Sequence, residues 1–101
     1  MNAIAVSVSD LFEVSESDTV WDAWLTTVNL IDMLEHTHRI KDYDFPQARD
    51  RIAKLCRVAQ AHSIDRGSCT CGMSDAEHAL IKRKMMTFFR LQVANLKHFV
   101  C

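Results

Sequence analysis

The sequence contains very little glycine and proline, with two Gly and one Pro in 101 residues. Strand-rich folds need many tight turns, and such turns draw on these two residue types, so their scarcity disfavours a strand-rich fold. Leu, Ala, Met, Lys and Arg are abundant instead, and they favour helices. A chain of this length buries roughly 60–70% of its unfolded surface, which is enough for one core. We therefore expect a single helical domain over residues 1–101.

Long apolar runs are also missing. No window approaches the roughly 18 apolar residues of a membrane span, and the start, MNAIAVSVSD, lacks the basic segment of a secretory signal. We therefore expect a cytoplasmic protein with no membrane partner. In that compartment cysteines stay reduced or bind metal rather than form disulfides. The four cysteines are Cys56, Cys69, Cys71 and Cys101.

The first 38 residues contain no Lys or Arg, although they hold seven acidic residues. Residues 39–101 hold all 12 basic residues and six acidic ones, so their net charge is +6 against −7 for the first part. The two parts either pair within the fold or face partners of opposite charge. The sequence leaves both readings open.

Apolar residues recur at three- and four-residue spacing in three segments, near 18–40, 45–66 and 75–99. Because the connections between these segments are short, the pattern predicts an all-α fold, a small antiparallel three-helix bundle. Residues 1–14 alternate like a strand but have no partner strand. We expect them to form an N-terminal arm or a short extra helix.

Capping signals delimit the three segments. Ser15 or Ser17 can cap the first helix, and Gly67 is the natural residue just after the second. A capping-box signature precedes the second and third helices. The two signature pairs are Asp44 with Gln47 and Ser74 with Glu77.

The stretch HSIDRGSCTCGMSDAEH, residues 62–78, has six residues between His62 and Cys69 and six between Cys71 and His78. In an antiparallel hairpin the histidines flank the connection, so all four side chains could meet at a tetrahedral zinc ion. Cys-x-Cys is rarer in zinc sites than Cys-x-x-Cys, however, and His62 falls on the apolar face of the second helix. We therefore expect no metal and no cofactor. The alternative is a zinc-stabilised regulatory domain that uses these four residues.

The two loop thiols are also candidate nucleophiles, because a helix N-terminus and the nearby Arg66 lower the pKa of a thiol. Catalysis would also need an oriented base and an oxyanion site. The sequence offers no such constellation. We therefore expect no catalytic residue and no enzymatic activity.

The stretch MMTFFRLQ places apolar residues around more than one face of the third helix. Met and aromatic side chains are enriched at interfaces. We therefore expect a non-enzymatic protein–protein interaction module, a small helical inhibitor, adaptor or regulator that docks on another protein or on its own copy. The expected partner-binding residues are Trp21, Arg83, Met86, Phe89, Arg90, Val93, Leu96 and Lys97.

A further alternative is nucleic-acid binding through the basic second and third helices. Basic stripes bind phosphate, but they normally accompany a basic total, and the sequence pI is near 6.5. Nucleic acid is therefore the less favoured partner. A compact protein of this kind could be encoded by a phage or another mobile element, although no residue indicates that origin.

Overall fold

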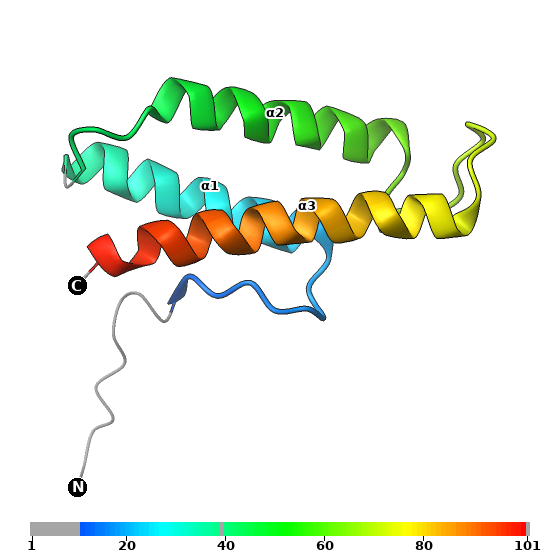
Figure 1. The fold of residues 1–101 in the computed structure, drawn as a ribbon, viewed down its shortest axis with the longest axis horizontal. Coiled ribbons are helices and arrows are strands. Elements are labelled where there is room, and N and C mark those ends of the chain that lie inside the picture. The colour runs from blue at the N-terminus through cyan, green and yellow to red at the C-terminus, as the bar shows by residue number, and fades with distance from the viewer. Residues whose placement is uncertain (1–10, 39, 101) are drawn as a thin grey trace, which may run out of the picture.

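The computed structural model describes residues 11–38 and 40–100. Three helices pack into a small bundle, each antiparallel to the next along the chain (Figure 1). They are α1 (Val20–Thr37), α2 (Phe45–Ala61) and α3 (Asp75–Leu96), and a short 3-10 turn, η2 (Lys97–Phe99), follows. Within the described residues there is no strand, so the predicted all-α bundle is confirmed.

The start of α1 lies two residues later than the sequence predicted. Thr19 is the N-cap, and its hydroxyl accepts a hydrogen bond from the backbone N–H of Asp22 at 3.1 Å. Ser15 and Ser17 do not cap the helix. The backbone N–H of Ser15 donates to the Asp18 carboxylate at 2.9 Å, so these residues form a separate turn that precedes the helix.

The end of α2 also differs from the prediction, because the helix ends at Ala61 rather than near residue 66. His62 is the C-cap, and the chain then takes left-handed conformations at Ser63 (φ 51°) and Asp65 (φ 60°). Gly67 therefore lies beyond the helix instead of directly after it. The caps that begin the other two helices agree with the sequence: Asp44 caps α2, and Ser74 and Glu77 form the full capping box of α3.

The core lies where α1 packs against α2 and α3. On α1 the buried face is centred on Ala23, Thr27 and Leu30, and the Thr27 hydroxyl donates to the Ala23 carbonyl at 2.8 Å. Trp24 and Val28 lie to one side of that face and are only half-buried. The side of α1 that holds Trp24 and Val28 is therefore left partly open.

The segment before α1 covers part of the bundle. Phe12 and Val14 pack against the core, whereas Leu11 is 71% exposed. In Figure 1 this segment, drawn in blue, runs alongside α3. The rest of the predicted arm, residues 1–10, lies outside the described residues.

No helix in the part of the chain that the structure describes has an apolar stretch long enough to cross a lipid bilayer.

Candidate metal centre

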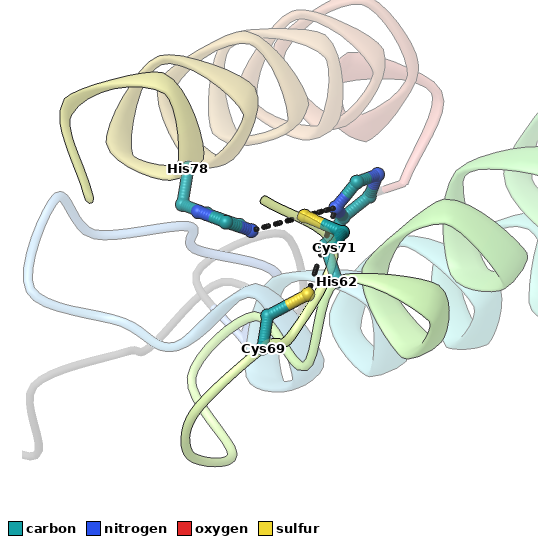
Figure 2. A group of neighbouring side chains, drawn as sticks. All are labelled: His62, Cys69, Cys71 and His78. Carbon is teal, nitrogen blue, oxygen red and sulfur yellow. Dashed lines mark hydrogen bonds between the residues drawn. The ribbon is translucent and has the colours of Figure 1, made fainter. Parts of the chain in front are cut away.

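Four potential metal ligands meet at the end of the bundle where α2 connects to α3. His62 is the C-cap of α2, Cys69 and Cys71 lie in the connection, and His78 lies in the first turn of α3. One donor atom from each residue lies within 4.8 Å of all the others. Figure 2 shows the four side chains pointing toward one another. The convergence that the symmetric spacing suggested is therefore present in the fold.

The distances within this cluster are close to those of a tetrahedral site. Cys71 Sγ lies 3.3 Å from His62 Nδ1 and 3.3 Å from His78 Nε2, and Cys69 Sγ lies 3.9 Å from His62 Nδ1. Zinc–sulfur bonds of about 2.3 Å and zinc–nitrogen bonds of about 2.0–2.1 Å place tetrahedral donors roughly 3.3–3.8 Å apart. The two contacts of 3.3 Å lie in that range and the contact of 3.9 Å lies just outside it, whereas the donor atoms as a set are within 4.8 Å of one another.

The start of α3 orients one of the histidines. The Ser74 side chain and Glu77 form the capping box, which fixes the first turn of the helix. The Ser74 carbonyl lies 2.8 Å from His78 Nδ1 and, being an acceptor, requires a proton on that nitrogen. In the neutral ring the lone pair is then on Nε2, the atom that faces Cys71. A histidine whose second nitrogen donates to a carbonyl is the usual arrangement at a metal.

The electrostatics of the cluster favour a thiolate at Cys71. A hydrogen bond from the backbone of Met73 lowers the pKa of Cys71 to about 6, and contacts with Cys69, His62 and His78 act in the same direction. The hydrogen bond to the Ser74 carbonyl, together with the contact to Cys71, raises the pKa of His78. Thiolate is the form of cysteine that binds metals, so Cys71 has ligand character near neutral pH.

The cluster combines two sulfur and two nitrogen donors. Thiolates and imidazoles in a tetrahedral arrangement suit zinc in both softness and geometry. Four protein donors would fill a tetrahedral coordination sphere and leave no position for water or substrate, as in structural zinc sites. A hollow of about 480 Å³ borders the cluster and is lined by Ser63, Asp65 and Lys82 among others, so solvent reaches the site from this side.

The structure does not leave the apolar residues expected to bind a partner from α3 on the surface. Met86, Phe89, Val93 and Leu96 are 5%, 1%, 3% and 3% exposed, so they belong to the core. The prediction that they form an accessible face is wrong. The apolar residues that seemed surplus on α3 are needed because α1 and the segment with Phe12 both pack on this core.

The other expected partner-binding residues mostly make contacts within the chain. The indole N–H of Trp21 donates to the Ile64 carbonyl at 2.8 Å. Arg90 and Lys97 form ion pairs with acidic residues of the segment before α1. Arg83 is exposed on α3.

An apolar groove that was not predicted from the sequence lies between α1 and α2. Its volume is about 330 Å³, and no residue of α3 lines it. On α1, Trp24 and Val28 directly follow the buried residues Ala23 and Thr27, so they lie about 100° around the helix from the buried face. The lining residues are Trp24, Val28, Ile31, Arg49, Ile52, Ala53, Cys56 and Arg57.

No protein-family model, curated protein or solved structure matches this chain. The fold and the site therefore define a class by geometry alone, a small three-helix bundle with a Cys2His2 donor set at its α2–α3 connection.

Proposed function

We propose that the protein is a non-enzymatic binding module, a small helical regulator or adaptor, in which a structural zinc ion fixes the α2–α3 connection. The observation that carries the zinc proposal is the convergence of four donor atoms within 4.8 Å from three separate parts of the chain. Cys71 is exposed and the other three side chains are half-buried, so hydrogen bonds among these thiols and imidazoles contribute little net stability of their own. A shared cation gives them a common partner.

Two features of the sequence disfavoured a metal, and neither prevents ligation in this geometry. His62 is the half-buried C-cap of α2, and its Nδ1 atom faces both thiols. The short Cys-x-Cys span also presents no obstacle, because Cys69 Sγ and Cys71 Sγ lie 3.9 and 3.3 Å from the same atom, His62 Nδ1. Both sulfur atoms can therefore reach the same point.

The closed donor set supports a non-catalytic role for the metal. If all four side chains bind the ion, no coordination position remains for a reacting water or substrate, and the metal serves the fold. The function of the protein would then depend on a surface that binds a partner. The apolar groove between α1 and α2 is the docking surface we propose, because amphipathic helices of partner proteins bind in apolar grooves between helices.

Metal analysis tests the zinc proposal. We expect one zinc per chain by native mass spectrometry after purification without chelator. The His78→Gln variant should lose the zinc, whereas His36→Gln, which changes an exposed histidine of α1, should retain it. Chelator should lower the melting temperature of the wild type by about 10 °C or more, the effect of losing a ligand present at 100 times its Kd in a domain of this size. Wild-type protein refolded with zinc that holds none, and melts at the same temperature with chelator, would refute the proposal.

A blocked groove tests the docking surface. Ala53 is exposed and lines the groove, so Ala53→Arg should fill it without disturbing the core. Ala94→Arg, on the exposed side of α3, is the matched control. We expect partners captured by the wild type, or self-association measured by sedimentation, to persist in Ala94→Arg and to be lost in Ala53→Arg. Equal binding by both variants would place the docking surface elsewhere.

A further inference from the structure

The connection that carries the donor atoms also holds the beginning of α1. The Asp65 carboxylate accepts a hydrogen bond from the backbone N–H of Val20, the first residue of α1, at 2.8 Å. The backbone carbonyl of the preceding residue, Ile64, accepts a hydrogen bond from the indole N–H of Trp21 at 2.8 Å. These contacts join residues 45 and 43 positions apart in the sequence. The α2–α3 connection is therefore also an anchor for α1.

Further contacts strengthen this anchor, which we define as Ile64–Arg66. Ile64 is 4% exposed and belongs to the core. The second oxygen of Asp65 lies 2.8 Å from Lys82 Nζ on α3. The Arg66 guanidinium carbon lies 3.9 Å from the centre of the Trp21 ring, a distance at which a cation is attracted to the ring face. The anchor thus contacts both α1 and α3.

The backbone of this region is in an unfavourable conformation. Ser63 and Asp65 are both left-handed, at φ 51° and φ 60°, although neither is glycine. Such residues cost free energy and persist only where the surroundings determine their conformation. One donor residue, His62, directly precedes this strained stretch, and two more, Cys69 and Cys71, follow it. Fixing both ends of the stretch limits the conformations that it can adopt.

We infer that metal binding and the anchoring of α1 are coupled, so that zinc occupancy controls how firmly the N-terminal end of α1 is held. This inference rests on the proposed zinc site. With the ion bound, His62, Cys69 and Cys71 hold the two ends of the connection. Ser63 and Asp65 then keep their left-handed conformation, in which the anchor contacts Val20 and Trp21. Without the ion, the strained stretch relaxes more readily and the contacts with α1 weaken. Zinc thus regulates a helix that supplies none of the donor atoms.

Coupling of this kind is reciprocal. If zinc strengthens the anchor by some factor, then weakening the anchor lowers the affinity for zinc by the same factor. Trp21→Phe is the suitable variant, because it removes the indole donor without changing any charge near the ion. Trp24→Phe is its matched control, since Trp24 lies one helical turn along α1 and lines the groove instead of contacting the anchor.

Zinc affinity and Trp fluorescence together test the inference. In competition with a chromophoric chelator, Trp21→Phe should bind zinc about five-fold or more weakly than the wild type, the lower range of typical coupling, whereas Trp24→Phe should bind as the wild type does. Trp24→Phe also leaves Trp21 as the single tryptophan of the chain. Adding zinc to this metal-free variant should shift the Trp21 emission to shorter wavelength and saturate at one equivalent.

The possible results separate the inference from the proposed function. If the wild type and Trp24→Phe bind no zinc, the proposed zinc site is wrong and the coupling falls with it. If one zinc binds with equal affinity to Trp21→Phe and Trp24→Phe, and the Trp21 emission does not respond, the zinc site stands and the coupling is overturned.

Discussion

The ammonium group of Lys97 lies 2.7 Å from the carboxylate of Glu13, although 84 residues separate the two in the sequence. Arg90 and Glu16 form a second contact of the same kind at 3.1 Å. The two pairs join the acidic segment before α1 to α3 and to η2. In Figure 1 this segment runs alongside α3. Part of the charge asymmetry between the two ends of the chain is therefore neutralised within the fold. The same pairs engage two of the basic residues on which nucleic-acid binding by α3 would depend.

These ion pairs connect the segment before α1 to the bundle but contribute little to the free energy of unfolding. The Glu13 side chain is 63% exposed, and water screens such pairs. We expect Lys97→Ala to lower the free energy of unfolding by about 0.2–1 kcal/mol, and the difference should shrink at high salt. Urea denaturation at two salt concentrations measures both effects. A loss that is larger and independent of salt would show that the aliphatic part of Lys97 has a packing role.

Phe89 is the largest fully buried side chain of the bundle, at 1% exposed. We expect Phe89→Ala to lower the free energy of unfolding by about 3–5 kcal/mol, the usual cost of removing a buried aromatic ring. Leu91→Ala is the control on the same helix, because Leu91 is 56% exposed and should change stability by no more than about 0.5 kcal/mol. A stable Phe89→Ala protein that fails only in binding would restore the partner-binding role predicted from the sequence.

The true N-cap of α1 can be identified by substitution. Thr19→Ala removes the hydroxyl that accepts the Asp22 N–H, so we expect a loss of about 1 kcal/mol. Ser17→Ala changes a nearby exposed hydroxyl outside the helix and should fall within about 0.5 kcal/mol of the wild type. Thermal denaturation compares the two variants. The opposite order would mean that α1 begins earlier than Val20.

The reactivity of Cys71 should depend on pH in the metal-free protein. Because its pKa is lowered to about 6, the thiolate predominates above that pH and is lost as the pH falls through it. Alkylation of Cys71 by iodoacetamide should therefore be fast at pH 7.5 and slow several-fold by pH 5.5. Cys56, which is half-buried and lines the groove, is the internal comparison. Mass spectrometry of peptides gives both rates, and a profile that keeps rising above pH 8 would show an ordinary thiol.

Bound zinc should protect the same thiol. A thiolate that is a metal ligand is a weaker nucleophile, so we expect one equivalent of zinc to slow the alkylation of Cys69 and Cys71 but not that of Cys56. If zinc slows all three cysteines alike, the protection comes from a general tightening of the fold rather than from ligation.

The sequence by itself determined the number and approximate positions of the helices and most of their caps. Hydrophobic periodicity and the capping side chains act within a few residues of one another, so they can be read without knowledge of the fold. Asp44, Ser74 and Glu77 are such cases. The symmetric spacing of His62, Cys69, Cys71 and His78 also indicated that these four side chains could converge on one point.

Tertiary structure decided the rest, because the deciding contacts join residues far apart in the sequence. Whether Phe89 faced a partner or the core depended on what packs over α3, and periodicity within one helix does not contain that information. The early end of α2 depends on the left-handed turn at Ser63 and Asp65, which the contacts of Asp65 with Val20 and Lys82 hold in place. The chain that follows this turn brings Cys69 and Cys71 back to His62 at the end of α2. Long-range contacts, rather than the local spacing alone, therefore brought the four donor atoms together.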